Sequence, residues 1–201
     1  MKKIVLDSLM EFVKKNCKFT NEKYEEILYG LEGIYLTVTK IIIIMIIAYL
    51  LGIFNEFLIL TLFYNGLRTT GFGLHATKSW ICLVFSLGVF LITPYLSMRF
   101  VFPKIIQVLV SFMCIIMFYL FAPADTEKRP IINKKRRRIY KVLTIIIALI
   151  YIGLIIIVKN NFITNAIMFS MIIESIMIAP LTYEVFNLKY DNYKTYIQKP
   201  A

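Results

Sequence analysis

Histidine and cysteine are scarce in this sequence. Its 201 residues contain one histidine, His75, and three cysteines, Cys17, Cys82 and Cys114. An odd number of widely separated cysteines does not match a disulfide framework, and a single histidine argues against a zinc site. We therefore expect neither a metal nor a cofactor.

Charged residues are also few. They make up 17% of the chain, while 59% of the residues are hydrophobic and the mean hydropathy is +0.74. This composition excludes an ordinary soluble domain and indicates an integral membrane protein. The net charge of +11 would suggest nucleic acid in a soluble protein, but here the basic residues lie between long apolar runs. We interpret them as topology signals and contacts with anionic membrane lipids, and expect no nucleic-acid partner.

The apolar residues form six runs, most of them close to the ~20 residues that a membrane-spanning helix needs. They cover residues 36–54, 56–67, 80–98, 101–122, 140–158 and 162–181. This pattern predicts an all-α, polytopic membrane protein with about six hydrophobic helices. The second run is short, so it either crosses the membrane or dips in and returns.

The first 33 residues are charged and amphipathic. Apolar residues between Ile4 and Val13 are flanked by lysines, which predicts a basic amphipathic helix on the membrane surface, and a second helix follows over residues 22–32. No cleavable signal peptide is apparent. We divide the chain into an amphipathic region at the cytoplasmic membrane face (1–33), a membrane-embedded domain (34–182) and a cytoplasmic tail (183–201).

Lysine and arginine are unevenly distributed about the six runs. With a cytoplasmic N-terminus, 20 of the 23 basic residues lie inside, and Arg99, Lys104 and Lys159 lie outside. Reversing the protein would invert this split, against the positive-inside rule. We therefore expect a multi-pass protein with both termini in the cytoplasm.

The histidine and one cysteine lie seven residues apart, at His75 and Cys82. Alone, each is more often structural than functional. Together they suggest a nucleophile and its base, because a neutral imidazole can take the thiol proton and the thiolate attacks carbonyl carbon far better than the thiol. On a straight helix the two side chains would be ~10 Å apart along the axis, too far for proton transfer.

His75 and Cys82 therefore need a bend or a loop between them. Gly71 and Gly73 permit such a loop. If Thr77 or Ser79 caps the following helix, Cys82 lies in its first turn, where the helix dipole favours the thiolate.

Two further features are candidates for function. Glu174 lies in the middle of the last apolar run, where a carboxylate is costly unless it is paired or protonated; Arg68, His75 or another chain could be its partner. Residues 122–141 form a hydrophilic loop with two prolines and a basic run. That run is either a positive-inside anchor or a docking surface for an acidic substrate segment. Its members are Lys134, Lys135, Arg136, Arg137 and Arg138.

These segments resemble the accessory gene regulator B (AgrB) family, membrane endopeptidases that process quorum-sensing peptide precursors. The resemblance covers most of the chain, and the histidine–cysteine segment is its most specific part. It rests on Arg68, Gly73-Leu74-His75-Ala76 and Cys82, on Ala122-Pro123-Ala124-Asp125 with Pro130 and the basic run, and on Ile172-Ile173-Glu174-Ser175 ahead of Pro180.

The resemblance implies a cysteine endopeptidase of the bacterial cell membrane that acts on a short amphipathic (AgrD-like) precursor. The precursor would be cut on the C-terminal side of the signal, with Cys82 holding the N-terminal fragment as a thioester. An internal cysteine or serine of the peptide would then attack the thioester and release a cyclic thiolactone or lactone. A shielded site favours this ring closure over hydrolysis.

The resemblance also implies a homodimer and marks Arg68 and Gly73 as supporting residues. Arg68 could bind a precursor carboxylate or stabilise the oxyanion, or it could be a topology signal only. Asn65, Asp125 and Glu174 are candidates for a residue that orients His75.

Two other functions stay open at this point. A peptide exporter or transport subunit without covalent chemistry would use Glu174 and the short second run for translocation. A membrane scaffold would use the basic run to recruit a soluble partner. A neighbouring reading frame for a short peptide with an acidic tail would favour the peptidase, and a neighbouring ATPase the exporter.

Overall fold

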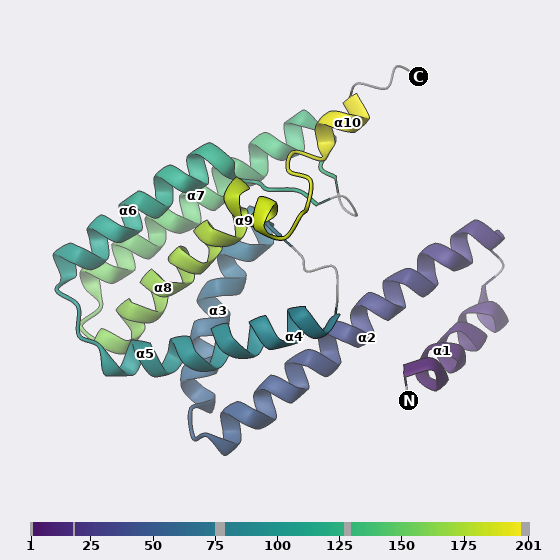
Figure 1. Ribbon diagram of the computed structural model, residues 1–201, viewed down its shortest axis with the longest axis horizontal. Coiled ribbons are helices and arrows are strands. Elements are labelled where there is room, and N and C mark those ends of the chain that lie inside the picture. Colours follow the sequence, from purple (N-terminus) through teal and green to yellow (C-terminus); the bar gives the residue numbers. More distant parts are fainter. Residues whose placement is uncertain (1, 18, 75–78, 127–129, 198–201) are drawn as a thin grey trace. The chain divides into compact units, whose positions relative to one another are not determined.

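The computed structural model describes residues 2–17, 19–74, 79–126 and 130–197. Helices joined by short connections make up most of this part of the chain, which divides into two compact units after Leu50 (Figure 1). The all-α fold predicted from the sequence is confirmed.

The N-terminal unit is a helical hairpin of α1 (Lys2–Asn16) and α2 (Asn21–Leu50). The Lys2 ammonium group donates to the Glu32 carboxylate, and Leu6 and Met10 of α1 are buried. α2 runs without a break from the predicted second helix over residues 22–32 into the first apolar run. It can do so because no proline interrupts the segment, and a helical glycine such as Gly33 costs only ~1 kcal/mol.

The second unit contains the other helices. They are α3 (Phe54–Gly71), α4 (Ser79–Leu87), the π-helical η1 (Gly88–Ile92), α5 (Thr93–Arg99), α6 (Lys104–Phe121), α7 (Lys134–Ile157), α8 (Asn161–Ile178), α9 (Pro180–Val185) and α10 (Tyr193–Ile197). Each of the six apolar runs therefore lies mainly in helix.

Within the described residues, five helical segments are long and apolar enough to span a membrane. They are Asn21–Leu50, Cys82–Arg99, Lys104–Phe121, Lys134–Ile157 and Asn161–Ile178. α3 is less apolar, but its 18 residues extend ~27 Å, close to the thickness of the hydrocarbon core. It is longer than the predicted run because its polar end, from Arg68 to Gly71, is also helical.

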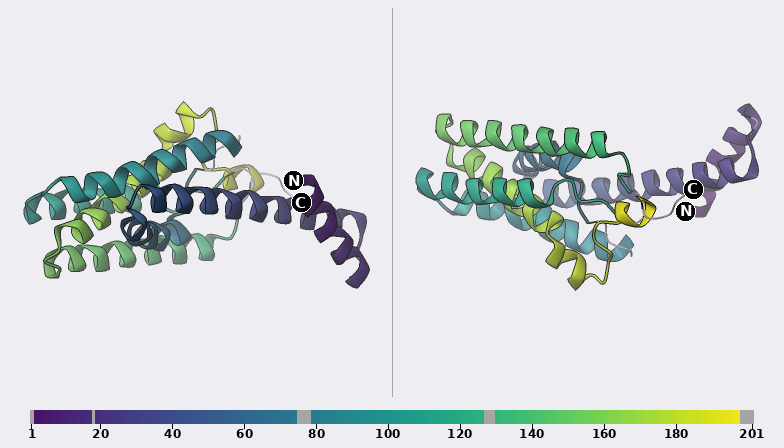
Figure 2. Two further views of the ribbon diagram at one scale, coloured as in Figure 1. Left: turned by 90° about the horizontal axis from the view of Figure 1, so that it is seen from below. Right: turned by 90° about the horizontal axis from the view of Figure 1, so that it is seen from above.

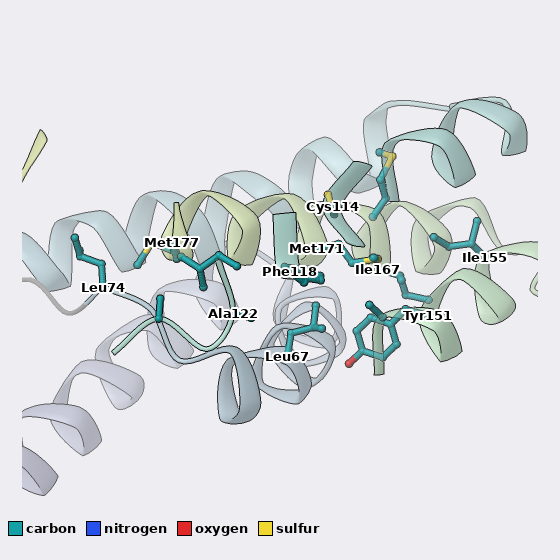
Figure 3. Close-up of a cluster of buried hydrophobic side chains, with 14 of the residues drawn as sticks. Leu67, Leu74, Cys114, Phe118, Ala122, Tyr151, Ile155, Ile167, Met171 and Met177 are labelled. Atoms are coloured by element: carbon teal, nitrogen blue, oxygen red, sulfur yellow. The ribbon is translucent and has the colours of Figure 1, made fainter. Parts of the chain in front are cut away.

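α8 is the central helix of the second unit. It contacts α3, α5, α6 and α7. Of its 18 residues 61% are buried, whereas 11–22% are buried in an 18-residue apolar stretch of each of the other four segments. α6, α7 and α8 lie side by side (Figure 2). Leu67, Phe118, Ile155, Ile167 and Met171 meet in the core that these helices form with α3 (Figure 3).

Polar contacts fix the first turns of α8, far from its Glu174. Asn165 donates to the carbonyl oxygens of Ser97 (3.0 Å) and Phe100 (2.6 Å) and accepts from Gln107 (2.8 Å). Lys104 donates to the carbonyl of Val158 at the end of α7 (2.7 Å), where the helix dipole favours a cation.

The stretch η1 lies between α4 and α5 without interrupting the helical path. Pro94, just after it, cannot donate to the carbonyl of Phe90, and its ring would collide with that carbonyl in a regular α-helix. The wider π turn accommodates this conflict.

Candidate functional site

The chain leaves α3 through three residues that lead to His75. We call Phe72, Gly73 and Leu74 the entry loop. Phe72 and Gly73 have φ values of 61° and 93°. Glycine adopts such values readily, whereas a non-glycine residue pays ~1–3 kcal/mol, which surrounding contacts must offset. Here the Phe72 ring packs edge-on against Tyr140, at 4.9 Å between centroids.

Backbone hydrogen bonds tie the entry loop to two distant segments. The N–H of Gly73 donates to the Ala124 carbonyl (2.8 Å), and the N–H of Leu74 donates to the Met177 carbonyl (2.9 Å). Ala124 in turn donates to the Gly71 carbonyl (3.0 Å). The connection after α6 and the end of α8 therefore both fix the backbone just ahead of His75.

Arg68, in the last turn of α3, binds the carbonyl side of the same loop. Its Nη1 donates to Phe72, and its Nη2 donates to Gly73 (3.3 Å) and Leu74 (2.6 Å). Of the partners that the sequence left open for Glu174, the structure places Arg68 beside it, with 3.6 Å from Nη1 to Oε2.

Glu174 is fully buried, and its carboxylate oxygens make no hydrogen bond to any residue that the structure describes. Gly71 and Gly73 leave room for the pair. A Cβ atom at Gly71 would lie 2.5 Å from Glu174 Oε1, and one at Gly73 would overlap Arg68 Nη1. Both positions therefore require a residue without a side chain for steric reasons, and Gly73 is also favoured by its positive φ.

Cys82 is the fourth residue of α4 (Ser79–Leu87), and the cap that the sequence suggests at Thr77 or Ser79 stays a prediction. It is half-buried. Tyr64 of α3 lies within electrostatic range of Cys82, Arg68 and Glu174, and its ring packs edge-on against Phe90 of η1 (5.3 Å). Tyr64 and Arg68 therefore lie one helical turn apart near the end of α3, with Glu174 of α8 beside Arg68.

His75 and Thr77 lie outside the described residues, and the pairing of His75 with Cys82 stays a prediction. Of the candidates for a residue that orients His75, Asn65 is exposed, and Asp125 and Glu174 are buried. Within the described part of the chain, His, Cys, Asp and Glu form no group that could hold a metal ion.

The basic run begins α7 and does not lie in a loop as the sequence predicted. The Asn133 side chain caps the helix by accepting from the N–H groups of Lys135 (2.9 Å) and Arg136 (3.2 Å), and this cap was missed. Lys134, Lys135, Arg136 and Arg138 are exposed. These four residues form what we call the basic face.

Arg137 differs from its neighbours because it turns inward. Its Nη1 lies 3.4 Å from Asp125 Oδ2, its Nη2 donates to the Pro123 carbonyl (3.3 Å), and the guanidinium lies over the Tyr193 ring at 3.6 Å. Only 18% of its side chain is exposed. Arg137 therefore supports the connection that holds the entry loop.

The C-terminal segment is attached to the same connection through Asp125. This carboxylate accepts from the N–H groups of Ile131 (3.3 Å), Asn192 (3.1 Å) and Tyr193 (3.0 Å). Burial raises the pKa of Asp125, against these donors and Arg137, which lower it. The sequence analysis did not predict this attachment. The tyrosines of the C-terminal segment were the feature of the sequence that could have indicated packing there.

An open groove lies where this segment meets the start of α7. Its volume is about 500 Å³, and Arg138, Lys141, Tyr190, Asp191 and Tyr193 contribute to its lining. Burial raises the pKa of Tyr190 to about 12, so its hydroxyl stays protonated at neutral pH. The groove combines cations with aromatic rings, and Asp191 is its acidic member.

Comparison with known proteins agrees with these motifs. The profile of the family accessory gene regulator B matches residues 6–178. The chain is 30% identical to an AgrB-like protein of Clostridium acetobutylicum (96% of this chain, 94% of the relative) and 35% identical to one of Listeria innocua (91% and 90%). It is 27% identical to the accessory gene regulator protein B of Staphylococcus aureus (92% and 96%). No solved structure matches the chain. The chain therefore belongs to the accessory gene regulator B family and, with it, to the Agr quorum-sensing system.

Proposed function

We propose that the chain is a membrane cysteine endopeptidase that cleaves the peptide precursor of a quorum-sensing signal. Cys82 is the nucleophile and His75 the base. The observation that carries this proposal is the position of Cys82 near the start of α4, within electrostatic range of Tyr64 in α3, the helix whose last turn carries Arg68.

The reaction has two acyl transfers. His75 takes the thiol proton, the sulfur attacks the scissile carbonyl carbon, and the collapsing intermediate expels the amine, which takes the proton back from His75. The product is a Cys82 thioester of the N-terminal fragment. A cysteine or serine within that fragment then attacks the thioester carbonyl, which releases a thiolactone or lactone and restores the Cys82 thiol.

The precursor binds through charge as well as through apolar contact. Arg138 of the basic face lines the groove together with Lys141, and the other three residues of the basic face are exposed in the first turn of α7, so an acidic peptide segment can be held there by several cations at once. Arg137 takes part only indirectly, because its side chain is held by Asp125 and Tyr193.

One end of the second unit supports the proposed arrangement in the membrane. The end of α3, the connection between α6 and α7 and the end of α8 are hydrogen-bonded to one another, as six passes with cytoplasmic termini require. We place this end at the cytoplasmic face of the cell membrane, where 20 of the 23 basic residues would lie. Exposed apolar residues of α6, such as Leu109, Phe112 and Met113, would face lipid or the second copy in a homodimer.

Mass spectrometry of the purified protein tests the covalent step. The protein in nanodiscs would be mixed with a short amphipathic peptide that has an acidic tail, taken from the reading frame beside its own. We expect an adduct on Cys82 with the mass of the N-terminal fragment less one water. Cleavage of the peptide by a Cys82→Ala variant at the normal rate would rule the proposal out.

A further inference from the structure

The entry loop has an unusually complete set of hydrogen bonds for a non-helical segment. The N–H groups of Phe72, Gly73 and Leu74 donate to Arg68, Ala124 and Met177. Their three carbonyl oxygens all accept from the Arg68 guanidinium. Every backbone polar group of the loop is therefore satisfied, which leaves it little freedom to move.

One side chain thus replaces the hydrogen bonds that a helix would have supplied. Arg68 can do this because its planar fork presents several N–H groups in fixed directions, whereas a lysine offers a single point charge on a flexible chain. The two terminal nitrogens of Arg68 point at the loop. This geometry does not favour the roles that the sequence left open, binding a precursor carboxylate or stabilising an oxyanion.

Glu174 supplies the charge that this arrangement needs. The Arg68 side chain is 16% exposed, and a guanidinium in such surroundings is costly without a nearby anion. The Glu174 carboxylate is at 3.6 Å, yet it accepts no hydrogen bond from the described residues, so it balances the charge without drawing Arg68 away from the carbonyls.

We infer that Arg68 and Glu174 are positioning residues: Arg68 holds the entry loop, and Glu174 neutralises Arg68, so that the chain enters the segment bearing His75 from a fixed point. Neither residue touches the substrate. The inference rests on the proposed function, since it matters for activity only if His75 acts on Cys82.

Two variants separate positioning from charge. Arg68→Lys keeps the positive charge, and hence the topology signal, but loses the fork. Glu174→Gln keeps the shape and removes the negative charge. Thr69→Ala is the matched control, because Thr69 is the next residue of α3 and its exposed side chain bonds only within its own helix, to Gly66. All variants would carry Cys17→Ala and Cys114→Ala, so that Cys82 is the one thiol.

Amide hydrogen exchange measures how firmly the entry loop is held. In Arg68→Lys, amide exchange at Gly73 and Leu74 should accelerate roughly tenfold or more, while exchange in α6 and α8 stays slow and shows that the protein is folded. Glu174→Gln should act in the same direction with a smaller effect, and Thr69→Ala should have none. Unchanged exchange at Gly73 and Leu74 in Arg68→Lys would overturn the inference, and unchanged exchange in Glu174→Gln would remove Glu174 from it.

Alkylation shows how the position of the loop affects the reactivity of Cys82. The rate of alkylation by iodoacetamide would be measured from pH 5 to pH 10. With the dyad in place, the rate near pH 7 exceeds that of His75→Ala. Arg68→Lys should lose about tenfold or more of the rate at pH 7 and little at pH 10, where the thiol ionises unaided. Fast loop exchange with an unchanged pH profile would refute positioning. If His75→Ala itself alkylates like the parent, the dyad fails, and the exchange data still decide whether Arg68 holds the loop.

Discussion

At the scale of single residues, the three cysteines have different surroundings. Cys17 is exposed in the N-terminal unit, Cys114 is buried in the core of the second unit, and Cys82 is the half-buried fourth residue of α4. We expect Cys82→Ala and His75→Ala to abolish precursor cleavage, and Cys17→Ala and Cys114→Ala to leave the catalytic rate nearly unchanged. Cleavage assays in membranes, with protein levels matched by immunoblot, measure this. Loss of cleavage in Cys17→Ala would point to a different nucleophile.

A second residue-scale prediction concerns the contact of α3 with α7. The hydroxyl of Tyr151 donates to the Phe63 carbonyl (2.8 Å) and lies against Gly66, where a Cβ atom would overlap it. Gly66→Ala should therefore lower stability by about 1–3 kcal/mol through overpacking.

Removing the hydroxyl provides the control for this overlap. A Cβ atom at Gly66 would lie 3.6 Å from the Tyr151 ring carbon that bears the hydroxyl, which is an ordinary contact. In a Tyr151→Phe background, Gly66→Ala should cost much less, a coupling that thermal unfolding of the four proteins would reveal. Equal costs in both backgrounds would show that the hydroxyl is not the obstacle.

At the scale of elements, α7 begins with charges that do not stabilise it. Cations in the first turn oppose the helix dipole, by ~0.3–1 kcal/mol each at low salt. The exposed residues of the basic face are thus not explained by helix stability, which favours a role in topology or in binding.

Binding measurements separate these two roles. Arg136→Gln with Arg138→Gln should weaken precursor binding roughly tenfold at low salt, and high salt should have a similar effect on the parent protein. Arg99→Gln, which changes an exposed arginine in α5, is the control. The variant must first be shown to insert correctly. Normal insertion with unchanged affinity would leave the basic face as a topology signal only.

The elements also show what the sequence could and could not predict. Long apolar runs indicated the helices, because a membrane leaves backbone polar groups no partner except within the helix. The predicted ends failed where polar residues continue a helix, as at the start of α7. The inward turn of Arg137 could not be predicted, because Asp125 and Tyr193 come from distant parts of the chain.

For the site, the sequence supplied the residue types and the structure supplied their contacts. The spacing of Arg68, Gly73 and Cys82 marked one segment as the candidate site. It could not show that Arg68 binds three carbonyl oxygens, because that depends on how the chain turns after α3. Glu174 was conspicuous as a charge in an apolar run, and only packing selected Arg68 as its neighbour.

At the scale of the whole molecule, the topology has a direct test. Lys134 and Lys159 are both exposed and lie at the two ends of α7. In a cysteine-free background, Lys159→Cys should react with an impermeant thiol reagent on intact cells, and Lys134→Cys only after permeabilisation. Labelling of Lys134→Cys from outside would contradict the six-pass arrangement.

The π-helical stretch Gly88–Ile92 limits how many residues can lie between α4 and α5. A π turn contains about one residue more than an α turn for the same full rotation, so the stretch takes up one residue without turning the helices on either side of it. The stretch therefore keeps the phase between Cys82 in α4 and the buried residues of α5, such as Ser97.

Deleting Val89 should let the segment continue as an ordinary α-helix. Hydropathy and insertion would hardly change, and Cys82 would keep nearly the same direction relative to α5, because the wide turn and the residue it takes up disappear together. Deleting Leu91 as well as Val89 would remove one residue more and turn Cys82 by about 100° relative to α5. Such a protein should accumulate normally in the membrane and leave Cys82 unreactive at neutral pH, which alkylation would measure. Membrane insertion tolerates a change in the number of apolar residues, whereas the direction of the Cys82 side chain depends on how many residues and which turns lie between Cys82 and Ser97.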